Sequence, residues 1–231
     1  MIAAVARTRK KDPTLADLIR DLGDVSPRRV RLQPPPGRAK VDDLIRINCR
    51  QDRIYELVNG TLVEKAMEAS EALVAFEVMM IMGAFVKPRR LGFILPPDAT
   101  LRIMPRLVRA PDISFIRRAK FRGGKFPRTP VPELVPDLAI EILSKSNRPG
   151  EIKRKLKEYF EAGVTAVWVI DPDTEMAKVY SAPNQFVEVN KDQAVDGGKL
   201  LPGFRLPLAE LFADLEEKPA RVKRNGKRKM S

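Results

Sequence analysis

The sequence predicts an α/β domain in which helices flank a mixed central β-sheet, with an N-terminal β-hairpin and a long helix beside it. Three patterns predict this class: a hairpin at residues 55–65, a helix at 68–86, and a strand–helix–strand run over 137–170. A hairpin pairs antiparallel strands, whereas strands joined through a helix lie parallel, so the sheet must be mixed. The 231 residues, 44% of them hydrophobic, can form one domain with a sizeable core.

The hairpin prediction rests on a two-residue turn between two apolar runs. Asn59 and Gly60 separate residues 55–58 from residues 61–65, and Asn-Gly adopts the positive φ values that such a turn requires. Residues 68–86 then follow as a long helix. Apolar side chains recur along this helix, among them Leu73, Phe76, Met80 and Phe85.

The remaining domain consists of short strands and two further helices. Strands are expected at residues 92–95, 100–104, 112–116, 137–143, 165–170, 176–181 and 185–189. A helix is expected at residues 149–162, with Gly163 as the residue that stops it, and a closing helix is expected at residues 207–215. The segment 121–135 is rich in glycine and proline and is expected to be a loop.

Composition divides the chain into three expected parts. These are an N-terminal extension over 1–41 with a short helix and a proline-rich linker, a folded domain over 42–217, and a basic disordered tail over 218–231. The net charge of +13 belongs to the flanks, since residues 1–50 hold 12 basic and 6 acidic side chains and residues 218–231 hold 7 basic ones and no acid. Such flanks either bind nucleic-acid phosphates or are solvated ends, and composition leaves both open.

The chain contains no histidine and one cysteine, Cys49. Ser-His and Cys-His catalysis within the chain and a zinc site made of Cys and His are therefore excluded. Any metal must be held by oxygen ligands, which favours Mg²⁺ or Mn²⁺. The single cysteine also excludes an internal disulfide, and the lack of disulfides is typical of proteins in the reducing cytoplasm. The apolar runs are too short to predict a membrane partner.

Glu141 lies inside an apolar strand-like run, residues 137–143. It shares one strand face with Ala139 and Leu143, so simple alternation of polar and apolar positions does not explain it. A carboxylate is costly to bury unless it is paired, hydrogen-bonded or bound to a metal. Glu141 therefore indicates either a cation site or an ordinary salt bridge to a neighbouring Arg or Lys.

Asp112 presents the same choice on the preceding strand, where it follows Pro111. It is the only acid in residues 100–128, among nine basic side chains, Arg102, Arg106, Arg109, Arg117, Arg118, Lys120, Arg122, Lys125 and Arg128. The aspartate either balances these charges or forms a metal site with Glu141. The arginines could equally hold a phosphate backbone near that site.

Two lysines border the apolar stripe of the helix at 149–162. The stripe comprises Ile152, Leu156, Tyr159 and Phe160. Lys153 and Lys155 lie at its two edges, and either could direct its ammonium toward the sheet. The alternative for each is a surface lysine with its stem on apolar neighbours.

Several stretches resemble the Uma-type restriction endonuclease family, within the PD-(D/E)XK nuclease superfamily. The matching stretches are YELVNGTLVEKAM at 55–67, PDISFI at 111–116, PDLAIEILS at 136–144, KLKEYFEAGVTAVWVIDP at 155–172 and LPGFRLPLAELF at 201–212. They keep their order and spacing, and together they cover roughly residues 42–215. The resemblance implies a restriction-endonuclease-like core and a nuclease-like domain over 42–217.

The resemblance also implies a set of catalytic residues. Asp112 matches the Asp of the Pro-Asp motif and Glu141 the Glu of the second motif, and together they would bind the metal, Mg²⁺ or Mn²⁺. Leu143 occupies the usual position of the superfamily lysine, and the pattern KLKEYF implies that Lys155 replaces it from the next helix.

Two further acids match family positions. Glu71 matches the acid that the first helix of such nucleases often contributes, and Glu56 matches a recurrent acid of the hairpin. Glu68 departs from the pattern, because relatives often carry glycine there.

The implied function is magnesium-dependent endonuclease hydrolysis of phosphodiester bonds in DNA through the Asp/Glu/Lys site. A catalytically silent nuclease-fold module that binds nucleic acid is the alternative, and an assembly component that contacts a protein partner is a third. The substrate could be DNA or RNA, with DNA favoured, and the protein could be a homodimer.

Overall fold

The computed structural model describes residues 12–50, 53–66 and 68–215. The basic tail at 218–231, which was expected to be disordered, lies outside these ranges.

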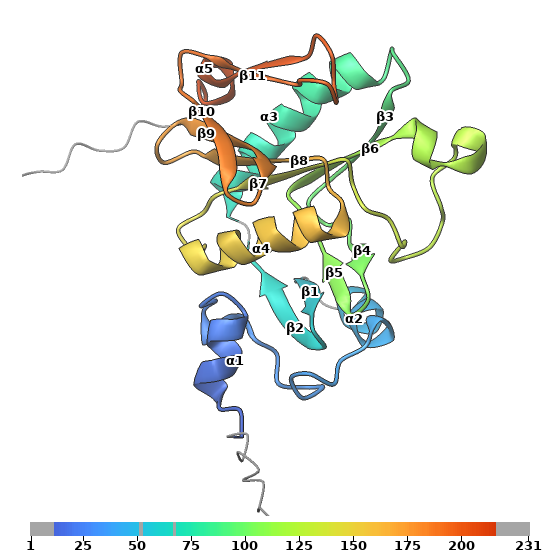
Figure 1. The fold of residues 1–231 in the computed structure, drawn as a ribbon, viewed down its shortest axis with the longest axis vertical. Helices are drawn as coiled ribbons and strands as arrows, with labels where there is room; N and C mark the ends of the chain where they lie inside the picture. The colour runs from blue at the N-terminus through green and yellow to red at the C-terminus, as the bar shows by residue number, and fades with distance from the viewer. Residues whose placement is uncertain (1–11, 51–52, 67, 216–231) are drawn as a thin grey trace, which may run out of the picture.

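A six-stranded sheet forms the centre of the molecule, in the order β10-β9-β8-β7-β6-β3 (Figure 1). Its strands are β3 (Gly92–Leu95), β6 (Ile113–Arg117), β7 (Leu138–Ile142), β8 (Ala166–Asp171), β9 (Met176–Ala182) and β10 (Gln185–Val189). β7 and β8 are parallel and are connected through α4 (Pro149–Ala162), whereas the other neighbouring pairs are antiparallel. The predicted mixed α/β sheet is confirmed.

The two faces of this sheet carry different helices, and Figure 1 shows α3 and α4 on opposite sides of it. One face packs against α3 (Ala69–Val86) and the short α5 (Leu208–Leu211), where Ile140 and Trp168 are buried. The other face packs against α4, where Ala139 and Val167 are buried beside Tyr159. This alternation along β7 and β8 follows from the pleat, and it makes both strands apolar on both faces.

The predicted hairpin belongs to a second sheet of four strands, in the order β2-β1-β5-β4. These strands are β1 (Ile54–Val58), β2 (Thr61–Lys65), β4 (Leu101–Met104) and β5 (Leu107–Arg109). Asn59 and Gly60 form the turn with φ of 50° and 79°, as the pattern requires. The helix α2 (Val41–Asn48) buries Leu44 against this sheet.

The segment before residue 42 packs against the domain. It contains α1 (Leu15–Asp21) and the turn η1 (Pro27–Arg29), and Leu22 and Val25 belong to the same core as Tyr159. Arg29 forms a buried bidentate ion pair with Glu151 of α4, with N–O distances of 2.9 and 2.8 Å. Residues 22–30 thus contribute to the core, although their composition predicts an extension.

The sequence patterns missed α2, β5 and the two-stranded sheet of β11 (Ala194–Asp196) and β12 (Arg205–Pro207). Three-residue strands are too short for alternation to be visible. The closing helix is also shorter than expected, because α5 ends at Leu211 and Phe212 turns into the core.

The long helix α3 carries apolar side chains on every side, and Glu71 and Glu77 are its charged residues. Val74, Val78 and Met82 are buried against the sheet, while Phe76 and Met80 are more than half exposed. Among the described residues, α3 is the one helix whose length and composition would allow it to cross a membrane, a test that core helices of soluble proteins also pass.

Gly92 is required by the close approach of β3 and β6. A Cβ at this position would lie 2.2 Å from the Ile116 carbonyl oxygen, whereas a Cβ at Gly83 in α3 would meet nothing within 4 Å. We expect Gly92→Ala to lower the free energy of unfolding by about 1–3 kcal/mol through overpacking. Gly83→Ala should raise it by roughly 0.5–1 kcal/mol, because alanine is the better helix former. Urea denaturation of both variants checks this, and equal stabilities would contradict it.

Candidate active site

Asp112 and Glu141 lie opposite each other at one end of the β6–β7 pair. The register pairs Ile113 with Ile140, so the next antiparallel positions are residues 112 and 141. Asp112 lies one residue before β6, and its Oδ2 accepts a hydrogen bond from the Ile142 backbone N–H at 2.7 Å. Both carboxylates are buried, with exposed fractions of 5% and 4%.

Two side chains of α4 contact Glu141. The Lys155 Nζ lies 2.7 Å from Glu141 Oε2, and the Tyr159 hydroxyl donates to Oε1. Residues four apart share one helix face, so both reach the same carboxylate. Lys153, the other border lysine, is exposed, and Lys155 is therefore the one that meets Glu141. Two expectations for this region thus meet in one contact. The salt bridge expected as the alternative for Glu141 is formed by Lys155, the lysine that the family resemblance assigned to the site.

The sequence patterns did not predict Lys65 as a member of this cluster. Its Nζ lies 2.8 Å from Asp112 Oδ1 and donates to the carbonyl oxygens of Pro97 at 3.0 Å and Ala110 at 2.6 Å. Strand alternation carried the missing signal, since Lys65 shares a face of β2 with Val63, which belongs to the core under α4.

Glu56 and Arg109 form a second buried layer beside the pair. Arg109 Nη1 lies 2.6 Å from Glu56 Oε2, and the Ala110 N–H donates to Glu56 Oε1 at 2.9 Å. Arg109 also pairs with Glu158, which accepts from Arg154 at 2.6 Å. Glu56, the family-matched acid, therefore orients Arg109 in the described structure.

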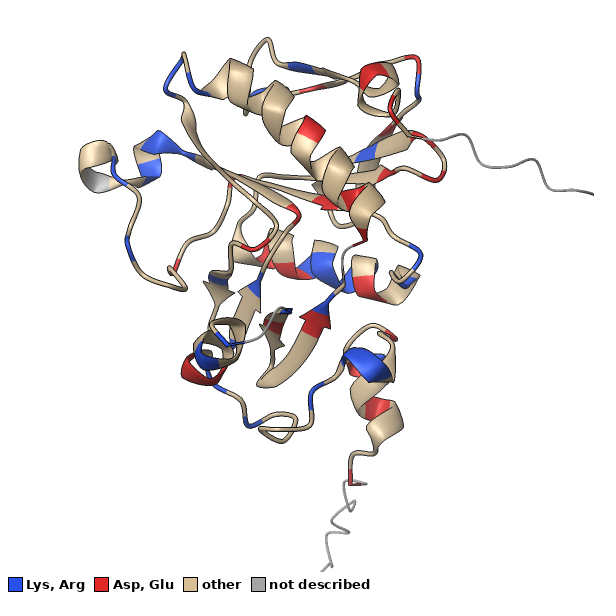
Figure 2. Ribbon diagram, turned by 180° about the vertical axis from the view of Figure 1, so that it is seen from behind, with Lys and Arg blue, Asp and Glu red and all other residues tan. Residues whose placement is uncertain are grey.

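The charges of the whole cluster balance. Four carboxylates, those of Glu56, Asp112, Glu141 and Glu158, meet four cations, those of Lys65, Arg109, Arg154 and Lys155. Figure 2 shows acidic and basic positions following one another along α4 in the centre of the molecule. In the part of the chain that the structure describes, no buried polar side-chain atom lacks a hydrogen-bond partner.

Burial and neighbouring charges shift the pKa values of this cluster. Burial would raise the pKa of Glu56, but the charges of Lys155 and Arg109 outweigh it and lower the pKa to about 2. Burial raises the pKa of Glu141, with Lys155 opposing and Asp112 adding to the rise. Burial alone would lower the pKa of Lys155, but Glu141 and Glu56 raise it above its usual value, so this ammonium stays charged.

Glu71 lies apart from the pair in its contacts. Its Oε2 accepts from the Glu68 backbone N–H at 2.8 Å, which caps α3. Among the described residues, it has no hydrogen bond or ion pair to Asp112 or Glu141. It lines a hollow of about 840 Å³ together with Leu143 and Ser144, next to the end of β7.

The basic residues around Asp112 are largely occupied within the protein. Arg109 is buried, and Arg117 pairs with the buried Asp137 at 2.7 Å. Arg106 donates to backbone carbonyls of Gly37 and Asn59. These three arginines have structural contacts, which weakens the expectation that they hold a phosphate backbone.

The two carboxylates have the right chemistry for a hard divalent ion, although each faces an ammonium. Mg²⁺ is commonly held by one or two carboxylates together with waters and substrate phosphates. Three of the four oxygens of Asp112 and Glu141 accept one hydrogen bond each, the fourth forms an ion pair with Lys65, and a carboxylate oxygen can accept a second partner. No three acidic, His or Cys side chains converge as a metal cage within residues 12–50, 53–66 and 68–215. The pair therefore fits an ion held by two protein ligands, provided that the ammonium of Lys65 or Lys155 moves away from its carboxylate.

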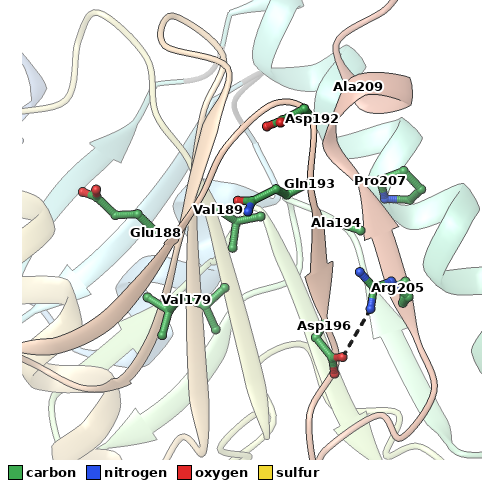
Figure 3. A pocket seen from close by; sticks show the side chains of 11 residues that line it. Val179, Glu188, Val189, Asp192, Gln193, Ala194, Asp196, Arg205, Pro207 and Ala209 are labelled. Atoms are coloured by element: carbon green, nitrogen blue, oxygen red, sulfur yellow. Dashed lines mark ion pairs between the residues drawn. The ribbon is translucent and has the colours of Figure 1, made fainter.

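Two further hollows lie away from the carboxylate pair. One of about 690 Å³ lies between β10 and the β11–β12 sheet, where Arg205 faces Asp196 (Figure 3). Another, of about 640 Å³, separates α4 from β9 and β10 and is lined by Lys153. Neither is lined by Asp112, Glu141 or Lys155.

Comparisons with known proteins show the family and the fold of the chain. The model of the Uma2 family, described as "Putative restriction endonuclease", matches residues 20–209. A crystal structure from Anabaena variabilis, described as a "putative nuclease belonging to DUF820", superposes with a TM-score of 0.63 at 20% identity, covering 71% of this chain and 92% of that one. A search among curated proteins found no match.

Proposed function

Because the chain belongs to the Uma2 restriction endonuclease family, we propose that it hydrolyses phosphodiester bonds of DNA with Mg²⁺ or Mn²⁺. The family and the fold support a nuclease function, and a nuclease acts on nucleic acid. The observation that carries the proposal is the buried pair of opposed carboxylates, Asp112 and Glu141, with Lys155 against the second. No histidine is needed for this chemistry, which agrees with the composition.

Asp112 and Glu141 would hold the divalent ion. When bound, the ion supplies Lewis-acid polarisation of the scissile phosphoryl oxygen. The chain's contribution is to fix the two carboxylates: the Ile142 N–H orients Asp112, and the Tyr159 hydroxyl orients Glu141.

Lys155 would stabilise the negative charge that develops on the phosphate in the transition state. Its ammonium remains charged because Glu141 and Glu56 outweigh the effect of burial on its pKa. In the described structure it donates to one carboxylate, so two of its three protons are available to a phosphate.

Incubation of purified protein with plasmid and with single-stranded and double-stranded oligonucleotides tests the proposal. We expect cleavage with Mg²⁺ or Mn²⁺, none with EDTA, and a loss of at least about 10²-fold in Asp112→Asn, because a ligand is removed. Parallel RNA substrates distinguish the two nucleic acids. Activity that survives Asp112→Asn, or no cleavage of any substrate, would remove the proposal.

One observation favours the second candidate, a silent nuclease-fold module that binds nucleic acid. Every oxygen of the carboxylate pair already has a donor within the protein. The affinity of such a module for DNA would fall with rising salt and would fall further when residues 218–231 are removed. Neither Mg²⁺ nor Asp112→Asn would change this affinity. Fluorescence anisotropy over a salt series separates it from the nuclease, whose cleavage requires the metal.

A further inference from the structure

The ammonium of Lys65 is held by three oxygen atoms. These are Asp112 Oδ1 at 2.8 Å, the Pro97 carbonyl at 3.0 Å and the Ala110 carbonyl at 2.6 Å. The two carbonyl contacts are hydrogen bonds, and the contact with Asp112 is an ion pair. The side chain of Lys65 is 7% exposed, and the three oxygens come from two segments of the chain, one at Pro97 and one at residues 110–112. Lys65 thus occupies an oxygen-lined cation position on the proposed metal ligand.

A divalent ion and this ammonium compete for the same carboxylate. Mg²⁺ binds carboxylate oxygens at about 2.0–2.1 Å, so an ion on Asp112 would lie close to the Lys65 Nζ and be repelled by it. The cluster is already neutral with Lys65 in place, and an added divalent ion leaves two excess positive charges in a buried region. Removal of the ammonium would relieve both effects.

The location of Lys65 suits displacement better than that of Lys155. Lys65 is the last residue of β2, and the next residue, Ala66, is half-buried. The four-carbon stem of Lys65 therefore lies near the end of the strand, from which it can turn toward solvent. Lys155 lies in the middle of α4 and is only 4% exposed, and its neighbours Leu156 and Tyr159 are buried as well. Lys65 thus lies at the end of a strand, whereas Lys155 is held inside a helix.

We infer that Lys65 is a built-in competitor of the divalent ion: its ammonium holds Asp112 until the ion displaces it, and so sets the affinity of the site for metal. This inference rests on the proposed function and adds a means of regulating the same site. The expectation is a weak metal site in the free protein, in which substrate phosphates help to retain the ion.

Titration calorimetry of the full chain with Mn²⁺, without DNA, tests the inference. We expect Lys65→Met to bind Mn²⁺ at least about tenfold more tightly than the wild type, because the competing charge is gone. Lys65→Met combined with Asp112→Asn should lose this gain, which assigns the ion to Asp112. The matched control is Lys178→Met, since Lys178 forms a surface pair with Glu188 and should not change the affinity.

Two further variants keep the test decisive if Lys65→Met does not fold. Lys65→Gln removes the charge but retains hydrogen-bond donors for the two carbonyls, and it should tighten Mn²⁺ binding as well. Lys65→Arg retains the charge and should keep the wild-type affinity. A folded Lys65→Met or Lys65→Gln protein with wild-type affinity would overturn the inference.

The outcome is separable from that of the proposed function. Tighter Mn²⁺ binding in Lys65→Met, together with no cleavage by the wild type, would support the competitor role and remove the nuclease proposal. Metal-dependent cleavage by the wild type, together with unchanged Mn²⁺ affinity in Lys65→Met, would overturn the competitor role alone.

Discussion

Lys155→Met is expected to lower the rate of DNA cleavage by roughly 10²–10³-fold, the usual effect of removing one group that stabilises transition-state charge. Lys153→Met, two residues away on the same helix, should leave the rate unchanged. The two lysines border the same apolar stripe, but Lys155 is buried 2.7 Å from Glu141, whereas Lys153 is exposed. Single-turnover cleavage at saturating Mg²⁺ measures both rates.

The same substitution also affects stability, and the two effects must be separated. Without Lys155, Glu141 is left as a buried carboxylate without its cation, which typically costs about 3–5 kcal/mol. Urea denaturation of Lys155→Met gives the loss of stability, and cleavage measured under conditions in which the variant remains folded gives the loss of rate. A folded Lys155→Met protein that cleaves at the wild-type rate would assign Lys155 a structural role and contradict the prediction.

Glu56→Gln is expected to lower the free energy of unfolding at pH 7 by about 3–5 kcal/mol, because it leaves Arg109 buried with one carboxylate fewer. Glu56 is 1% exposed and lies 2.6 Å from the Arg109 guanidinium, so solvent does little to screen the loss. Arg109 keeps its contact with Glu158. Glu161→Gln, in an exposed pair with Lys157, is the control and should change stability by less than about 0.5 kcal/mol.

The pH dependence of stability gives a second test of Glu56. Its folded pKa of about 2 lies below the ordinary value of 4.5, since the charges of Lys155 and Arg109 outweigh burial. A depressed pKa contributes stability that is present above pH 4.5 and is lost as the pH falls toward 2. The wild type should therefore lose on the order of 3 kcal/mol more than Glu56→Gln across this window. Urea denaturation at several pH values measures it, and parallel losses in both proteins would exclude the ionised Glu56.

Much of the fold could be predicted from local patterns. The Asn59-Gly60 turn, the α4 helix that ends at Gly163 with φ of 95°, and the strand that carries Glu141 all appear where the residues predict them. Each depends on neighbours in the sequence. By contrast, the sequence patterns missed α2 and β5. Both elements are short, and their apolar residues become recognisable as core residues only when they are seen packed with the four-stranded sheet.

The candidate site was predictable only in part. Burial logic selected Asp112 and Glu141, and helix periodicity reduced the lysine to Lys153 or Lys155. Lys65 and Arg109 were not found, since each meets its carboxylate across about fifty residues of chain.

The sequence by itself determined the order of the longer strands and helices, the exclusion of histidine chemistry and the two acids that need a partner. Periodicity assigns a side chain to one face of its own element, and composition limits the ligands that it can meet. The tertiary structure decided what lies opposite: α4 brings Lys155 to Glu141, and the hairpin brings Lys65 to Asp112. Those contacts depend on how the sheets and α4 pack, and packing is a property of the whole core that no local pattern contains.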